Sequence, residues 1–220
     1  MTNAHYHRGD GTFLSLRGRE FRFYGLHPWR AEGASVMALT AMLRAVLGID
    51  PSSGVGEIGL DRLKTKEVAP VQREIFLAQL EVAAEWHRPV VLHGAKCWGE
   101  VVKAIKPFVG AIPAFLFHGF SRSGGLLPEI VALNGFVGVG PAVLNDHAVN
   151  YRALVKTLPL DRILVETDDD VADDRIRETT LAAVFAKTAE LTGLTEAQLD
   201  ANAVAFIEAR RRSGPCVPPS

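Results

Sequence analysis

The chain has 220 residues, 48% of them hydrophobic, and a formal net charge of −1. This length and composition predict one globular domain with a sizeable core. The near-zero net charge excludes a global electrostatic attraction to nucleic acid or to anionic membranes. It leaves open a polyanionic substrate, which a local cationic group or bound metal ions could attract.

The cysteine count and the apolar runs indicate where the protein works. Cys97 and Cys216 are the two cysteines, too few for a disulfide framework and suited to a reducing cytoplasm. The chain opens on polar residues without a signal peptide, and no apolar run approaches the ~18 residues of a membrane span. We therefore expect a cytoplasmic protein that engages no membrane, of undetermined oligomeric state.

Apolar runs of strand length alternate with longer segments of helical period along most of the chain. Strands are expected at 21–27, 54–61, 89–94, 114–120, 135–140 and 162–167, and helices at 34–47, 67–87, 98–108, 125–134, 147–157, 175–192 and 196–211, the last with Thr195 as N-cap. Such alternation predicts βα units and a parallel sheet. We interpret the chain as an α/β protein, a distorted (β/α)8 TIM barrel that forms a single domain over residues 1–212. The proline-rich residues 213–220 are expected to form a disordered tail.

The N-terminal segment breaks this alternation. Residues 3–7 and 12–16 could each be a short strand, yet only Arg8-Gly9-Asp10-Gly11 separates them. A parallel crossover needs a dozen or more residues, so either the first helix is missing or one strand is misread. We favour a missing first helix, which would distort the barrel at this point.

The glycine-rich segment 54–61 reads as a buried strand with one anomaly. Glycines inside a strand indicate that another backbone or a ligand comes close. Glu57 stands where an enclosed strand should carry a branched aliphatic side chain. Burying an unpaired carboxylate is costly, so we expect a cation or strong donors beside Glu57.

Side chains that can bind metal ions follow the ends of the expected strands. They are His5, His7, His27, Glu57, His93, His118 and Asp168. The C-terminal ends of barrel strands form the active face, so these groups should converge. His5 and His7 lie so near the terminus that a solvated histidine pair is an alternative for them. Glu166 shares a face with Asp168 and is interpreted as a buried supporting group.

Histidine and carboxylate ligands without cysteine suit Zn²⁺, Mn²⁺, Fe or Mg²⁺, and they do not choose among these metals. His5, His7, Glu57, His93, His118 and Asp168 make six such ligands, more than one tetrahedral ion requires. We therefore expect one or two divalent ions, and a pair ~3.5–4 Å apart with Glu57 as the bridge would use all six. The metals would lower the pKa of a bound water toward ~7 and so supply a hydroxide nucleophile. Asp168 could hold a metal and take the proton of the water as general base.

The motifs resemble those of one family, the TatD-like metal-dependent deoxyribonucleases. They are, in order, Gly25-Leu26-His27-Pro28, Gly56-Glu57-Ile58-Gly59-Leu60-Asp61, Pro89-Val90-Val91-Leu92-His93, Phe117-His118-Gly119-Phe120-Ser121, Leu164-Val165-Glu166-Thr167-Asp168 and the closing Asn202-Ala203-Val204-Ala205-Phe206. The resemblance covers residues 21–210. It implies a TIM barrel of the metal-dependent hydrolase superfamily that carries divalent metals and cleaves phosphodiester bonds in DNA.

The resemblance also implies roles for individual residues. By motif position, the metal ligands are His5, His7, Glu57, His93, His118 and Asp168, with Glu57 and Asp168 catalytic. His27 resembles a substrate-side histidine. Ser121-Arg122-Ser123-Gly124 resembles the loop after the second ligand histidine, and its backbone amides, Ser hydroxyls and Arg122 would make a phosphate cradle. Lys96 is a further candidate for substrate binding.

Three segments depart from the family pattern. The opening Asp-Thr-His-x-His is Asn3-Ala4-His5-Tyr6-His7 here, and His-Pro-His is His27-Pro28-Trp29. The indole of Trp29 could stack on a base or merely pack. Thr-Asp-Ala/Ser-Pro becomes Thr167-Asp168-Asp169-Asp170, followed by Asp173 and Asp174. These acidic groups would repel a phosphate backbone unless metals, Lys96 or Arg122 offset them.

The leading functional hypothesis is a metal-dependent phosphodiesterase, a deoxyribonuclease acting on DNA ends or single strands. Its partner would be DNA or another phosphate-containing substrate. One alternative is a metal-dependent hydrolase of a different ester or amide, either a small molecule or one linked to tRNA, because one barrel hosts several chemistries. The other alternative is a non-catalytic relative that keeps the barrel.

Overall fold

The computed structural model describes residues 1–8, 11–63, 68–121, 124–169 and 173–209. Some predictions fall outside these ranges: the role of Arg122, the expected tail at 213–220 and any statement on Cys216. Within the described part of the chain, no helix combines the length and the apolar character that crossing a membrane demands.

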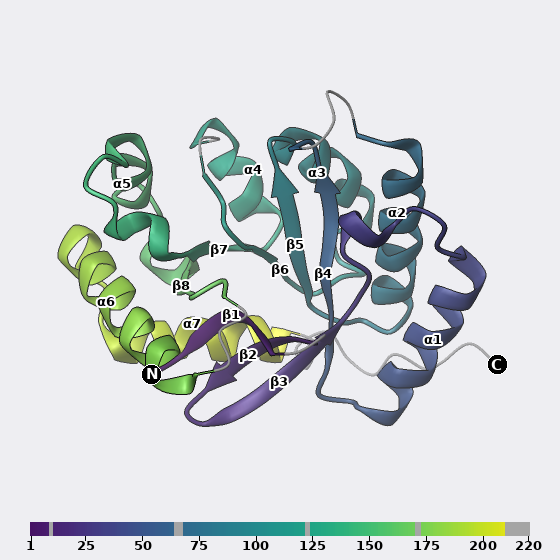
Figure 1. Ribbon diagram of the computed structural model, residues 1–220, viewed down its shortest axis with the longest axis horizontal. Helices are drawn as coiled ribbons and strands as arrows, with labels where there is room; N and C mark the ends of the chain where they lie inside the picture. The colour runs from purple at the N-terminus through teal and green to yellow at the C-terminus, as the bar shows by residue number, and fades with distance from the viewer. Residues whose placement is uncertain (9–10, 64–67, 122–123, 170–172, 210–220) are drawn as a thin grey trace.

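One eight-stranded sheet, with its strands in chain order, wraps into a nearly closed barrel (Figure 1). The strands are β1 (Asn3–Arg8), β2 (Gly11–Leu16), β3 (Arg19–Tyr24), β4 (Gly54–Asp61), β5 (Val90–Ala95), β6 (Phe115–Phe117), β7 (Gly135–Val139) and β8 (Ile163–Val165). From β3 to β8 every neighbouring pair is parallel. Two backbone bonds join β1 to the segment after β8: His7 N donates to Asp169 O at 2.7 Å, and Asp168 N donates to His5 O at 3.1 Å. The predicted (β/α)8-type barrel is confirmed.

Helices lie around the outside of the sheet (Figure 1). They are α1 (Val36–Ile49), α2 (Pro70–Glu85), α3 (Trp98–Ile105), α4 (Leu127–Ala132), α5 (Val149–Val155), α6 (Asp174–Thr192) and α7 (Glu196–Glu208). Each expected helix is present, with ends shifted by a few residues. Thr195 caps α7 as predicted and forms a reciprocal capping box with Gln198.

The barrel begins with two hairpins, and the first helix is missing as predicted. β1 ends at Arg8 and β2 begins at Gly11, so both N-terminal segments are strands and no crossover helix separates them. β2 returns to β3 through a tight turn at Arg17 and Gly18, both with positive φ, the conformation that suits two-residue hairpins. β2 therefore runs antiparallel to both neighbours, a departure from the parallel sheet that the alternation predicted. The physical reason is length: two-residue connections can join only antiparallel strands.

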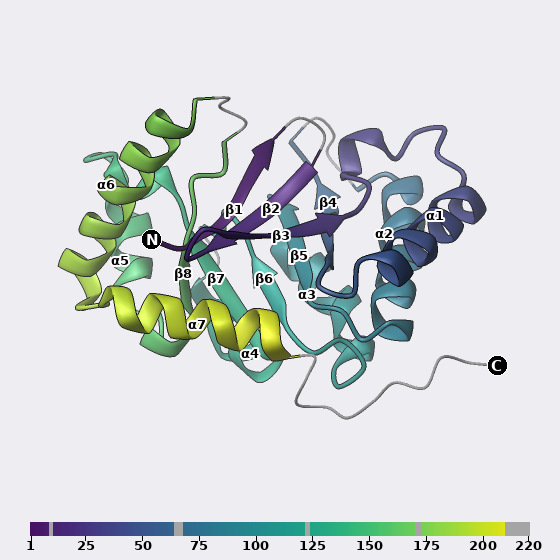
Figure 2. The same cartoon turned by 90° about the horizontal axis from the view of Figure 1, so that it is seen from below.

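Helix α7 closes the underside of the barrel, as the view from below shows (Figure 2). Its Phe206 is fully buried, and the ring stacks on Phe23 at 6.0 Å and meets Phe136 edge-on at 5.6 Å between centroids. Asn202 on the same helix donates to the carbonyl oxygens of Leu160 and Ile163, at 2.7 and 2.8 Å. These bonds hold the start of β8, whose far end leads into the candidate site.

The glycines of β4 allow the neighbouring strand to approach closely, as expected for glycines inside a strand. A Cβ at Gly59 would overlap the backbone carbonyl of His93 on β5. The approaching group is thus backbone, and this close approach sets the relative position of Glu57 and His93 on the two strands.

Candidate metal centre

Glu57 is the hub of the site. It lies in the middle of β4 and is only 5% exposed. Its carboxylate oxygens lie 2.5 Å from His93 Nδ1, 2.7 Å from His118 Nε2, 3.2 Å from His5 Nε2, 3.5 Å from His7 Nε2 and 3.6 Å from His27 Nε2. The structure thus places nitrogen groups around Glu57, as its burial requires.

Five segments besides β4, far apart in the sequence, contribute side chains to the cluster around Glu57. Apart from Glu57 on β4, the cluster takes His5 and His7 from β1, His27 from after β3, His93 from β5, His118 from after β6 and Asp168 from after β8. Asp168 Oδ1 lies 3.3 Å from His5 Nδ1 and 3.4 Å from His118 Nδ1. His5 is fully buried, so a solvated pair at the N-terminus is not what the structure contains. All six predicted metal ligands lie in one cluster.

The charges in the cluster depend on one another. Burial would raise the pKa of Glu57, but the surrounding imidazoles, His118 foremost, hold it well below its ordinary value. Burial would lower the pKa of His5, but Asp168 and Glu57 outweigh it and raise that pKa to about 10. Protons on His5 and His118, whose pKa values are both raised by the neighbouring carboxylates, thus compensate those carboxylates, and a divalent cation could take their place.

The cluster contains buried polar atoms that the protein leaves without hydrogen bonds. Among the described residues these include both ring nitrogens of His5, Nδ1 of His118 and Oε2 of Glu166. In the part of the chain that the structure describes, three sets of side chains have ligand atoms within 4.8 Å of one another: His5–His7–Glu57, His27–Glu57–His93 and His5–His118–Glu166. Mixed nitrogen and oxygen donors at this spacing fit divalent metal ions.

Glu166 supports the cluster from below. It is fully buried, and its Oε1 accepts a hydrogen bond from Gly119 N at 2.7 Å and lies 3.9 Å from His118 Nδ1. Burial raises the pKa of Glu166 to about 7. The carboxylate fits because residue 138 is glycine, where a Cβ would overlap it.

Asp61, at the last position of β4, is a site residue that the strand-end reasoning left unassigned. Its Oδ2 accepts hydrogen bonds from His93 Nε2 at 2.9 Å and from Trp29 Nε1 at 2.8 Å. Burial would raise the pKa of Asp61, but hydrogen bonds from Leu63, His93 and Trp29 lower it. The sequence signal was present, since Asp61 ends the glycine-rich motif, but its partner depends on how β4 aligns with β5.

The backbone at two site positions is in the left-handed region. Lys96 has φ +58° and Asp168 has φ +50°, which is uncommon for residues other than glycine. Such conformations cluster at functional sites, where surrounding bonds must hold them. For Asp168 the holding bond is its own N–H to His5 O in β1.

Two pockets meet at the cluster, and His93, His118 and Asp168 line both. One, of about 750 Å³, extends over Arg62, Lys96 and Ser121. The other, of about 480 Å³, extends over Thr12, His27, Trp29 and Arg30. The described substrate-binding candidates thus divide between the two pockets, with Lys96 and Ser121 on one side and His27 and Trp29 on the other.

Thr12 is a second residue that sequence reasoning missed. It is the second residue of β2 and pairs with His7 in the β1–β2 hairpin, and its hydroxyl lies 3.4 Å from His7 Nδ1. A search at the ends of strands cannot find it, because β2 runs in the opposite direction and brings its first residues to the active face.

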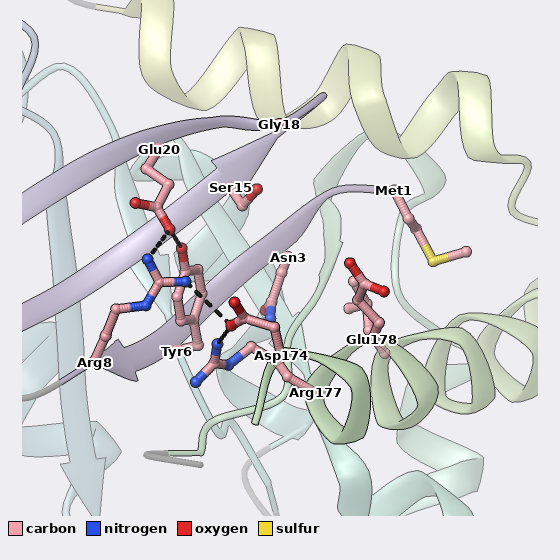
Figure 3. A pocket seen from close by; sticks show the side chains of 11 residues that line it. Met1, Asn3, Tyr6, Arg8, Ser15, Gly18, Glu20, Asp174, Arg177 and Glu178 are labelled. Carbon is pink, nitrogen blue, oxygen red and sulfur yellow. Dashed lines mark hydrogen bonds and ion pairs between the residues drawn. The ribbon is translucent and has the colours of Figure 1, made fainter. Parts of the chain in front are cut away.

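A separate pocket of about 450 Å³ lies on the other face of β1 (Figure 3). Tyr6 and Arg8 alternate with the site histidines and point into it. Tyr6 and Arg8 both bond to Glu20, and Arg8 and Arg177 both pair with Asp174. These charges satisfy one another and tie β1 to β3 and α6, so we assign this pocket a structural role.

Comparison with protein families gives one extended match. The model of the family described as TatD related DNase matches residues 16–208. The "3'-5' ssDNA/RNA exonuclease TatD" of Pectobacterium carotovorum is 31% identical over 145 residues, which cover 66% of this chain and 55% of that protein. An uncharacterized metal-dependent hydrolase, YabD of Bacillus subtilis, is 30% identical over 114 residues, 52% of this chain and 45% of that protein. The chain thus spans about half the length of the curated relatives it matches.

Solved structures show the same architecture. The crystal structure of YJJV, a TatD homologue from Escherichia coli, superposes with a TM-score of 0.71 at 26% identity, covering 86% of this chain and 75% of that one. A TatD family hydrolase from Entamoeba histolytica superposes with a TM-score of 0.65 at 14% identity, covering 84% of this chain and 73% of that one. At 14% identity, the similarity to the Entamoeba histolytica protein is one of fold alone.

Proposed function

Because the chain belongs to the TatD related DNase family, we propose that it is a metal-dependent hydrolase that cleaves phosphodiester bonds in DNA ends or single strands. One observation carries the proposal: the buried carboxylate of Glu57 is surrounded by imidazoles from four other segments, with unpaired ligand atoms beside it. A purely structural core would not retain such a set, because each unpaired buried polar atom costs stability.

We propose that His5, His7, Glu57, His93, His118 and Asp168 hold one or two divalent ions. Glu57 has the central position that a bridging carboxylate needs, because each of its two oxygens faces at least two imidazoles. A divalent ion bound there would lower the pKa of a water molecule and stabilise the charge that develops on the phosphate. The experiment below tests which metal ion supports turnover.

Asp168 is proposed as the general base. Its carboxylate contacts His5 and His118, yet its side chain is 38% exposed to the mouth where the two pockets meet. An anchored and accessible carboxylate can accept a proton from water at Oδ2 while Oδ1 stays against the imidazoles. Burial would raise the pKa of Asp168, but its close contact with His5 and the charge of His118 lower it, which keeps the carboxylate ionised and able to accept a proton.

The two pockets suit an extended phosphate chain. Lys96 and Ser121 offer a cation and a hydroxyl on one side of the cluster, and Trp29 offers an indole face on the other. Aromatic faces stack on bases and cations neutralise phosphates, which is how single strands are held without sequence preference. His27 lines the same pocket as Trp29 and lies beside both Glu57 and Trp29. Trp29 and Arg122 are thus proposed substrate contacts, the latter by motif position only.

The test is a turnover panel on protein stripped with chelator and reloaded with Mn²⁺, Mg²⁺ or Zn²⁺. Substrates are end-labelled single-stranded and duplex DNA, bis(p-nitrophenyl) phosphate and p-nitrophenyl acetate. We expect metal-dependent shortening of the single strand, and Glu57→Gln serves as the inactive control. Turnover of the acetate but of no phosphodiester would replace the proposal by a hydrolase of another ester. Failure to bind any of the three metals would favour the non-catalytic relative.

Two further proposals concern the whole chain. We propose that residues 1–212 form a single domain, since one sheet and its helices include nearly all described residues. We also propose a cytoplasmic location, supported by Cys97, which is buried as a free thiol, as a reducing compartment allows.

A further inference from the structure

The buried carboxylate of Asp61 accepts hydrogen bonds from three donors. It is 2% exposed and stands at the end of β4. Oδ1 accepts from Leu63 N at 2.6 Å, and Oδ2 accepts from both Trp29 Nε1 at 2.8 Å and His93 Nε2 at 2.9 Å. The bond from the backbone of Leu63 fixes the orientation of the carboxylate, which leaves Oδ2 directed at the two rings.

This bond determines which nitrogen of His93 faces the cluster. A carboxylate oxygen can only accept, so the bond to Asp61 needs a hydrogen on Nε2 of His93, and the contact with Glu57 needs one on Nδ1 that a metal ion would replace. Nδ1 is on the other side of the ring, 2.5 Å from Glu57 and 3.2 Å from His118 Nε2. A histidine that binds a metal through one nitrogen commonly donates from the other to a carboxylate, which fixes the ring and strengthens the ligand.

Trp29 anchors the same oxygen from the pocket side. The residue is 57% exposed, but the indole N–H is directed inward to Asp61 Oδ2. The backbone N–H of Trp29 donates to His27 Nδ1 at 3.2 Å, so the turn η1 (Pro28–Arg30) holds the indole in place. The indole thus stands in the pocket with one edge tied to the group that orients His93.

We propose that Asp61 is a positioning residue that fixes His93 with Nδ1 toward the metal ions, and that Trp29 couples the substrate pocket to this bond. This inference rests on the proposed metal-dependent function. Trp29 replaces the second histidine of the family's His-Pro-His pattern, so the link through an indole is a property of this chain.

The first test measures metal affinity by calorimetric titration of chelator-treated protein with Zn²⁺ and with Mn²⁺. Asp61→Asn leaves one acceptor oxygen for three donors. The affinity of this variant for metal ions should fall by ~10- to 100-fold, the usual effect of losing a carboxylate that accepts a hydrogen bond from a metal-binding histidine. Trp29→Phe keeps an aromatic ring and loses one donor, and its affinity should fall by less than that of Asp61→Asn. The matched control is Asp200→Asn, a buried carboxylate on α7 that bonds to Thr2 and Arg17, and it should bind both metals like the wild type.

The second test reads the bond itself in metal-free protein by nitrogen-15 NMR of side chains. In the wild type, the Nε2–H of His93 and the Nε1–H of Trp29 should be visible at low field, because bonding to Asp61 slows their exchange with water. In Asp61→Asn the His93 signal should broaden or disappear and the Trp29 signal should move upfield. Thermal unfolding of each variant shows whether the fold survives.

The outcomes separate the inference from the proposed function. A wild type that binds no metal refutes the function, while the NMR signals still decide whether Asp61 holds His93. Wild-type metal affinity in Asp61→Asn, or an unchanged His93 signal, would overturn the positioning role. If Asp61→Asn does not fold, Trp29→Phe decides: unchanged metal affinity together with an unchanged His93 signal would refute the coupling.

Discussion

At the scale of single residues, the site depends on the burial of Glu57. A carboxylate inside a strand could be recognised from sequence because the other residues of 54–60 are all glycine or apolar. The convergence of His27, His93 and His118 could also be predicted, since each follows an apolar run and barrel strands end at one face. Asp61 could not be assigned, because its bond to His93 depends on the alignment of two strands.

Replacing Glu57 by Gln tests the role of the central carboxylate. The amide keeps the shape of the side chain but removes the charge that faces the imidazoles, so turnover should fall by at least ~10²-fold while the fold survives. Steady-state kinetics with the reloaded metals, alongside circular dichroism, measures both. The matched control is Glu85→Gln on the surface, where the carboxylate pairs with Arg44 and turnover should not change. Wild-type turnover in Glu57→Gln would refute its assigned role.

At the scale of elements, α7 positions the strand that leads to Asp168. The Asn-x-x-x-Phe motif at residues 202–206 was visible in the sequence, but its partners were not. The structure shows that Asn202 bonds to the chain entering β8 and that Phe206 fills the barrel floor. Strand ends were harder to predict: β6 and β8 are three residues long, because pairing stops where the chain turns into the site.

Asn202→Ala should destabilise the protein by ~1–3 kcal/mol. The change leaves two carbonyl oxygens, those of Leu160 and Ile163, without their donor in a largely buried place. Urea unfolding followed by circular dichroism measures the free energy of unfolding. Asn150→Ala, at an exposed position of α5, is the control and should change stability by less than ~0.5 kcal/mol. Equal stability of the two variants would contradict the role given to Asn202.

The pH dependence of stability tests a second contact of α7. Burial would raise the pKa of Asp200, but bonds from Thr2 and Arg17 hold it below its ordinary value. A carboxyl with a lowered pKa in the folded state stabilises the fold above its unfolded-state pKa, and this stability is lost as the pH falls through the folded-state pKa. Asp200→Asn should therefore lose stability less steeply than the wild type below about pH 4. Because Arg17 is mostly exposed, the difference should stay under ~1 kcal/mol. Parallel acid-unfolding curves for the two proteins would contradict this.

At the scale of the whole molecule, one centre joins the beginning, middle and end of the chain. The alternation of strands and helices predicted the barrel, and the short spacing at the N-terminus predicted the missing helix. The reversed direction of β2 was not predicted, because periodicity reports which face is buried and says nothing about strand direction.

Removing metal should lower the melting temperature of the whole protein. The proposed ligands come from β1, β4, β5 and the segments after β6 and β8, so an ion bound to them stabilises only the folded chain. At 100 times the dissociation constant the stabilisation is about 2.7 kcal/mol. For a chain of this size that corresponds to roughly 5–10 °C, measurable by calorimetry with and without chelator. A melting temperature that does not respond to chelator or to added metal would contradict a metal centre shared by these strands.

The reversed β2 has a consequence for engineering. The two ends of β2 lie at opposite ends of the barrel: Thr12 near its start lies beside His7, whereas Leu16 at its end leads into Arg17 and Gly18. A peptide tag or reporter inserted between Arg17 and Gly18 should therefore leave catalysis intact, while the same insertion after Arg8 should abolish it. The same insertion at the two ends of one strand thus gives two proteins, one expected to be active and one inactive, and each serves as the control for the other.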